Sequence, residues 1–146
     1  MSRAEFVCIP RLRVRWAEVD MQKIVFNGHY LTYIDTAIAE YWREIGLPYP
    51  QGYVERYGSD IYLRKATVEY LDSARYDDVL EVCCRTAALG RTSMTFAFEI
   101  YRESAQTPLV TAELVYVNAD AAMKTASLPA DLRARVIAYE RIAPQQ

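Results

Sequence analysis

The chain has 146 residues, a length that predicts one domain covering residues 1–146. Its 17 basic and 19 acidic side chains give a net charge of −2, which argues against a surface that binds nucleic acid through its phosphates. The single histidine, His29, excludes zinc sites that need two or more imidazole ligands, and no metal site is predicted.

The cysteines and the apolar segments predict the compartment. Cys8, Cys83 and Cys84 form no CxxC pair, and an odd number without a regular spacing is typical of reduced thiols in a cytoplasmic protein. No apolar run approaches the roughly 20 residues that span a bilayer, and residues 1–16 lack the apolar stretch of a signal peptide. We therefore expect a cytoplasmic protein with no membrane association.

Residues 6–16 alternate between apolar and polar side chains, and this period of two predicts a half-buried strand. Trp16 falls on its apolar face. Pro10 interrupts the strand and favours an edge position or a bulge, because proline cannot donate a ladder hydrogen bond.

Residues 30–46 have a different period, with apolar side chains every three or four positions. This spacing predicts one long amphipathic helix. Gly46 supplies its end, and Asn27 or Gly28 could supply its N-cap.

Alternation returns after a loop at residues 47–58, in which one short helical turn is expected. The phase of the next strand switches near Arg64 and Lys65, as it does at a β-bulge. Three more strands then follow with short connections, which predicts antiparallel hairpins. These strands are expected within residues 80–88, 94–100 and 110–116, and a closing helix at 129–142.

The order of these elements predicts an α+β fold. A single antiparallel sheet must bury its apolar face against another layer, and the helix at 30–46 is the only long one. We therefore expect an antiparallel sheet wrapped around one long central helix.

The loop between the first strand and the long helix can carry chemistry. It contains Asp20, whose carboxylate could fold back over the first turn of the helix, where unpaired N–H groups point outward. Such donors stabilise an oxyanion, and a carboxylate beside them can act as nucleophile or general base. The arrangement suits ester or thioester hydrolysis without a metal. Glu18, at the end of the strand, is expected to be solvated.

The stretch RVRWAEVDMQKIVFNGHYLTYIDTA, residues 13–37, resembles the 4-hydroxybenzoyl-CoA thioesterase-like family of hotdog-fold acyl-CoA thioesterases. In that family's motif an aromatic strand end precedes an acidic residue and an aspartate. A glycine follows three positions later, then two β-branched residues, an aromatic residue and a tyrosine that opens the helix. The matching positions are Trp16, Glu18, Asp20, Ile24, Val25, Phe26 and Tyr30.

The resemblance implies a hotdog fold and roles for residues around the helix start. Asp20 matches the catalytic aspartate, and the N–H of Asn27 matches the oxyanion donor. Some relatives have a histidine at the position of Asn27, whereas here His29 lies two residues later and could reach the site from the helix. Lys23 stands where the family usually has glycine. Family members pair their sheets across a dimer, so a homodimer or homotetramer is expected.

The resemblance also implies an acyl-CoA substrate and no separate cofactor, since coenzyme A is part of the substrate. The turn ALGRTS resembles the one that often lies near the coenzyme in the family. Within it, Arg91, Thr92 and Ser93 are candidates to contact its phosphates or pantetheine arm, although the residues by themselves slightly favour a plain polar turn.

Two other functions stay open. A hotdog dehydratase or hydratase acting on a thioester would pair a histidine with a carboxylate, and His29 with Glu40 is the only plausible pair, at an unusual spacing. The departures at Lys23 and His29 also keep open a catalytically inactive homologue that binds coenzyme A or serves as a scaffold.

Overall fold

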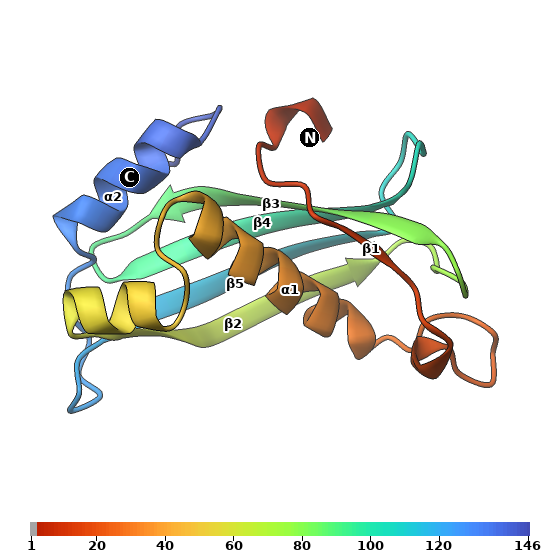
Figure 1. Cartoon of the computed structure of the whole chain (residues 1–146), viewed down its shortest axis with the longest axis horizontal. Helices are drawn as coiled ribbons and strands as arrows, with labels where there is room; N and C mark the ends of the chain where they lie inside the picture. The colour runs from red at the N-terminus through yellow and green to blue at the C-terminus, as the bar shows by residue number, and fades with distance from the viewer. Residues whose placement is uncertain (1–2) are drawn as a thin grey trace.

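The computed structural model describes residues 3–146, which form one antiparallel sheet with a long helix packed against one face (Figure 1). The order of the strands across the sheet is β1-β3-β4-β5-β2. Their bounds are Arg11–Arg13 for β1, Asp60–Tyr70 for β2, Val79–Leu89 for β3, Ser93–Arg102 for β4 and Val110–Ala119 for β5. The predicted α+β fold, an antiparallel sheet around a helix, is confirmed.

The long helix α1, His29–Glu44, lies across the concave face of the sheet (Figure 1). Its apolar side chains follow the predicted period and are buried; they are Tyr30, Tyr33, Ile34, Ala37, Ile38, Tyr41 and Trp42. The helix ends before Gly46, whose φ of 82° is the left-handed conformation that glycine adopts without strain. Packing against the sheet, rather than a side-chain cap, therefore positions this helix.

The strand side chains predicted to face the core do so on β4. Met94, Phe96, Phe98 and Ile100 alternate toward the core on β4 and are all buried. The register of β2 against β5 shifts between Leu63 and Lys65, which confirms the predicted bulge. β2 is an edge strand with β5 as its single neighbour, so one of its sides offers unpaired backbone groups.

The predicted N-terminal strand at residues 6–16 is wrong over most of its length. Only Arg11–Arg13 form β1, and Cys8 makes an isolated bridge with Cys84. Pro10 accepts a hydrogen bond from Val82 but has no N–H to return, so the ladder breaks there. Trp16 begins a 3-10 turn, Trp16–Glu18, and its side chain is 82% exposed.

Two short helices cover the other end of the molecule. A single turn, Gln51–Glu55, occupies the predicted loop, and α2, Ala130–Tyr139, lies within the predicted closing helix. α2 packs beside the last turns of α1, where Glu140 accepts a hydrogen bond from Tyr41 at 2.6 Å. These short helices do not cover the first turn of α1, which lies at the opposite end. There residues 16–28 fold beside it instead (Figure 1).

Candidate active site

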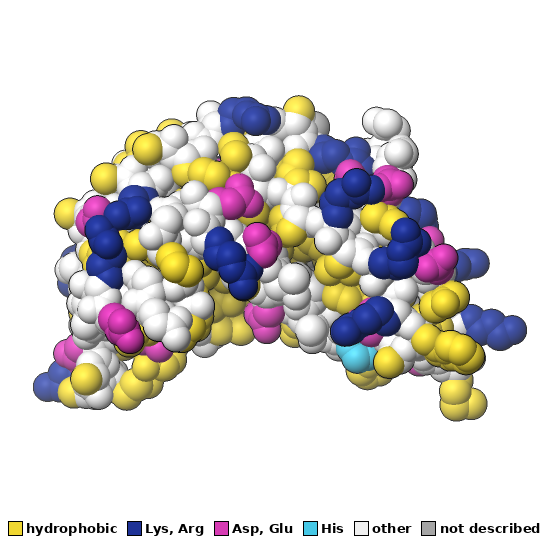
Figure 2. Space-filling model, in the orientation of Figure 1, with side chains coloured by type: hydrophobic (Ala, Val, Ile, Leu, Met, Phe, Trp, Pro, Cys, Tyr) yellow, Lys and Arg dark blue, Asp and Glu magenta, His cyan; other side chains and the backbone are white. Residues whose placement is uncertain are grey.

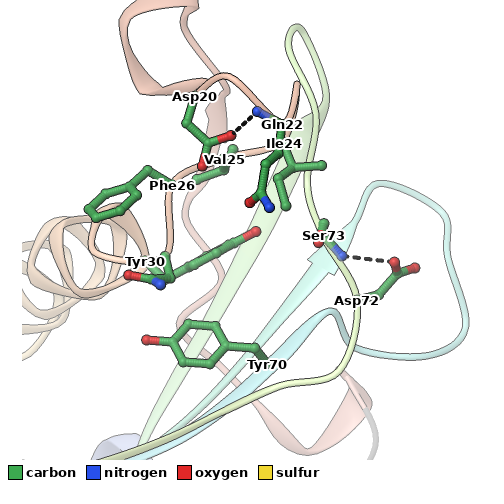
Figure 3. A pocket seen from close by; sticks show the side chains of 10 residues that line it. Asp20, Gln22, Ile24, Val25, Phe26, Tyr30, Tyr70, Asp72 and Ser73 are labelled. Carbon is green, nitrogen blue, oxygen red and sulfur yellow. Dashed lines mark hydrogen bonds between the residues drawn. The ribbon is translucent and has the colours of Figure 1, made fainter.

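A pocket of about 300 Å³ opens at the first turn of α1 (Figure 3). Its walls come from the loop before the helix, from the helix itself and from the end of β2. The lining residues are Asp20, Gln22, Ile24, Val25, Phe26, Asn27, Tyr30, Tyr70, Asp72 and Ser73. Asp20 and Asn27, predicted from the sequence to share a site, therefore face the same pocket.

Asp20 is held in a tight hairpin. Val19 and Val25 form an isolated bridge, and the N–H of Asp20 donates to the carbonyl of Ile24 at 3.0 Å. The Asp20 carboxylate accepts the N–H of Gln22 at 2.8 Å (dashed in Figure 3). This local bond fixes one carboxylate oxygen, as in an Asx turn, and leaves the other available to the pocket.

Lys23 occupies the left-handed position of this hairpin, with φ of 65°. A side chain at such a φ brings Cβ close to the backbone and costs roughly 1–2 kcal/mol, which glycine avoids. The backbone thus keeps the conformation that glycine favours, although a lysine stands here.

The start of α1 supplies hydrogen-bond donors. Among the described residues, no acceptor is found for the N–H groups of Asn27 and Gly28. Gly28 is the N-cap position and provides no side-chain cap. These N–H groups and the positive end of the helix dipole favour negative charge at this point.

Aromatic side chains form the floor of the pocket. The rings of Tyr30 and Tyr70 lie 5.7 Å apart, and the Tyr30 hydroxyl accepts the N–H of Ala74 at 3.0 Å. Burial raises the pKa of Tyr30, so this phenol stays neutral. Tyr70 and Asp72 were missed in the sequence, because alternation along β2 does not show which strand end closes on the helix.

Glu18 is not solvated, contrary to the sequence prediction; it is 6% exposed. The chain turns at Trp16 instead of continuing as a strand, and this turn directs Glu18 inward to Tyr33, while the exposed Arg15 side chain also bonds its carboxylate. Glu18 does not line the pocket.

The other candidate residues do not line this pocket. The His29 ring packs edge-on against Phe26, with centroids 5.9 Å apart, and is not among the residues that line the pocket. Arg91, Thr92 and Ser93 follow β3, whose first residue, Val79, pairs with β1 near the Asp20 hairpin. An 11-residue strand spans about 35 Å, so these residues lie at the far end of the same sheet.

A second pocket, of about 280 Å³, is lined by another carboxylate, that of Asp35 on α1, and burial raises the pKa of this group. The three cysteines are buried, and burial raises the pKa of Cys83 to about 12, which keeps it a thiol. No group of His, Cys, Asp and Glu that could hold a metal ion is found among the described residues. None of the helices in that part of the chain is long and apolar enough to cross a membrane.

The curled sheet, the single long helix and the pocket at its first turn define a hotdog-fold protein. The chain belongs to the thioesterase-like superfamily, whose family model matches residues 14–136. With that family it falls among the thioester hydrolases.

Individual relatives agree with this assignment. The chain is 30% identical over 119 residues to the acyl-CoA thioester hydrolase YbgC of Escherichia coli, covering 81% of this chain and 87% of the relative. A crystal structure of a hypothetical protein from Aquifex aeolicus, 29% identical, superposes with a TM-score of 0.79 and covers 88% of this chain and 98% of that one. A 1,4-dihydroxy-2-naphthoyl-CoA thioesterase from Synechocystis, 18% identical, has the same fold, with a TM-score of 0.78 and coverage of 88% and 93%.

Proposed function

We propose that this protein hydrolyses an acyl-CoA to a free acid and coenzyme A, with Asp20 and the first turn of α1 as its catalytic groups. The observation that carries the proposal is that Asp20 and Asn27 line one pocket, at a helix start whose N–H groups have no acceptor among the described residues. The family and the YbgC relative support the thioester chemistry.

In this mechanism the thioester carbonyl oxygen accepts hydrogen bonds from the N–H groups near Asn27. The charge that develops on this oxygen is stabilised by donors that are already oriented, a contribution worth a few kcal/mol per donor. Asp20 then either attacks the carbonyl carbon, giving an acyl–aspartate that water hydrolyses, or removes a proton from the attacking water. In both routes the C–S bond breaks and the sulfur leaves as the thiolate of coenzyme A. No cofactor is required.

A dehydratase reaction is less well supported. His29 and Glu40 lie eleven positions apart on α1, which separates them by about 16 Å along the helix axis. Glu40 instead forms an ion pair with Arg43 at 2.5 Å. The two groups therefore cannot act on one thioester within a single chain.

We also propose that the active unit is a homodimer or homotetramer, assembled through the edge of β2. This edge carries large exposed apolar side chains, Tyr62, Leu63 and Tyr70, beside unpaired backbone groups. Hydrophobic side chains also gather at the hollowed lower edge of Figure 2, where β2 lies. Arg91, Thr92 and Ser93 can contact coenzyme A in such an assembly only at the site of another subunit. Sedimentation velocity that shows only monomer would contradict this part.

The product of the reaction tests the proposed function. Purified protein is incubated with a panel of aromatic and aliphatic acyl-CoA esters, and release of the free coenzyme A thiol is followed. We expect thiol release with at least one ester, unchanged by EDTA, because the pocket uses no metal. An enoyl thioester as product would indicate a dehydratase, and tight coenzyme A binding without turnover would indicate an inactive homologue.

A further inference from the structure

The carboxylate of Glu18 is buried beside the pocket and accepts four hydrogen bonds. Oε1 accepts the N–H of Arg15 at 2.8 Å and the hydroxyl of Tyr33 at 2.8 Å. Oε2 accepts Nε and Nη2 of the same Arg15 guanidinium at 2.9 and 2.7 Å. Each oxygen thus accepts two hydrogen bonds, and the Arg15 side chain that supplies two of the four is 78% exposed.

These bonds keep the group ionised. Burial raises the pKa of Glu18, but the hydrogen bonds from Arg15 and Tyr33 and the nearby guanidinium outweigh it, and the pKa is lowered overall. Burial and the bond to Glu18 raise the pKa of Tyr33, which remains a donor.

Glu18 joins three segments that build the pocket. Its side chain bonds Tyr33, which lies one turn after Tyr30 on α1. Its backbone carbonyl accepts the N–H of Phe26 at 3.0 Å, directly before Asn27. Its own chain reaches Asp20 two residues later. One residue thus connects the helix, the donor segment and the hairpin that carries the Asp20 carboxylate.

We infer that Glu18 is a positioning residue, which with Tyr33 holds the Asp20 carboxylate and the N–H of Asn27 at a fixed separation across the pocket. The inference rests on the proposed function, since it assigns Asp20 the reacting role. Because Glu18 does not line the pocket, it acts on the rate through Asp20 and not through substrate binding.

Steady-state hydrolysis by Glu18→Gln tests this role. We expect kcat to fall roughly tenfold or more, as small misplacements of reacting groups cost that much, while KM stays within about twofold. Glu140→Gln is the matched control: Glu140 is also buried and also accepts a tyrosine hydroxyl on α1, that of Tyr41, but at the opposite end of the helix. It should keep the wild-type kcat.

A second arm separates positioning from general damage. In an Asp20→Asn background, Glu18→Gln should lower the residual rate no further, because the group that it positions is already disabled. An equal fold-loss in both backgrounds would overturn the inference, as would wild-type kcat in the single variant or the same loss in Glu140→Gln. If Glu18→Gln fails to fold, Tyr33→Phe, which removes one hydroxyl, enters the same comparison.

Amide hydrogen exchange provides a readout that needs no activity. Exchange within residues 19–27 should be roughly tenfold faster in Glu18→Gln than in the wild type, and unchanged in Glu140→Gln. Unchanged exchange in Glu18→Gln would contradict the inference. A wild type that hydrolyses no acyl-CoA would refute the proposed function alone, and the exchange result would still decide whether Glu18 fixes the hairpin.

Discussion

Two hairpins of this protein have closely similar hydrogen bonds, although the Asp120 carboxylate accepts one more, from the N–H of Lys124 at 3.0 Å. In the first, Asp20 accepts the N–H of Gln22 on its side chain, and in the second Asp120 accepts the N–H of Ala122 in the same way, at 2.8 and 2.9 Å. Each aspartate N–H donates to the residue four positions on, at 3.0 and 2.9 Å. Lys23 and Met123, three positions after each aspartate, have φ of 65° and 63°.

In each hairpin a tyrosine hydroxyl also bonds a side chain two residues before the aspartate; we call this bond the brace of the hairpin, and the two braces correspond. Glu18 accepts the hydroxyl of Tyr33, and Asn118 accepts the hydroxyl of Tyr53 at 2.9 Å. The carbonyls of Glu18 and Asn118 each accept an N–H eight residues on, at 3.0 and 2.9 Å.

The surroundings of the hairpins differ. Asp20 faces the start of α1 and a pocket of about 300 Å³, whereas Asp120 borders a smaller one of about 160 Å³ beside Ser59 and Asp60. In both places the aspartate therefore stabilises its own turn. Proximity to the helix start distinguishes Asp20, for which we propose the catalytic role, from Asp120, and the second hairpin supplies controls for the first.

Removing the brace hydroxyls should have the largest effect on stability. Tyr53→Phe leaves the buried amide oxygen of Asn118 without this donor and should cost about 1–3 kcal/mol of unfolding free energy. Tyr33→Phe should cost less, about 0.5–1.5 kcal/mol, because Glu18 keeps its bonds from Arg15. Urea unfolding measures both. A greater cost for Tyr33→Phe, or a loss of kcat in Tyr53→Phe, would break the comparison.

Relieving the backbone strain at the two residues with positive φ should change the free energy of unfolding less, and in the opposite direction. Lys23→Gly and Met123→Gly each remove the Cβ strain at a positive φ. Glycine also makes the unfolded chain more flexible, which cancels part of this gain. The net stabilisation should therefore reach at most about 1 kcal/mol for each substitution. Similar gains in urea unfolding are expected. Destabilisation by either substitution would show that its side chain makes contacts worth more than the strain.

The pH dependence should separate the charged brace from the neutral one. The pKa of Glu18 is lowered below its ordinary value of 4.5 by folding, so its contribution is complete above that value and is lost as pH falls through the lowered pKa. The stability difference between wild type and Glu18→Gln should therefore shrink between about pH 7 and about pH 3. A difference that grows toward low pH would contradict the direction of this shift.

The sequence predicted the elements whose pattern is local and continuous. The helix at α1, the bulge after Leu63 and the inward face of β4 follow from side-chain period, which depends on near neighbours. The prediction for Trp16 and Glu18 was wrong because the alternation continues past Arg13, where β1 ends, into the 3-10 turn Trp16–Glu18.

Long-range contacts account for what the sequence could not show. The bond from Tyr33 to Glu18 joins residues 15 positions apart, and Asp72 reaches the pocket from the end of β2. For Asp20 and Asn27, the resemblance to a known family motif indicated which polar residues of the loop before α1 to predict as catalytic. The structure places both at one pocket; their catalytic roles are still predictions.

The turnover of Asp20→Asn beside that of Asp120→Asn tests the central claim most directly. Both substitutions remove a carboxylate charge from a similar turn, and because Asp120 also accepts the N–H of Lys124, the structural cost of Asp120→Asn should be at least as large. With an acyl-CoA that the wild type hydrolyses, kcat should fall by about 10²–10⁴ in Asp20→Asn and stay within about twofold of wild type in Asp120→Asn. Full activity in Asp20→Asn, or an equal loss in both variants, would contradict the assignment of Asp20 as the catalytic group.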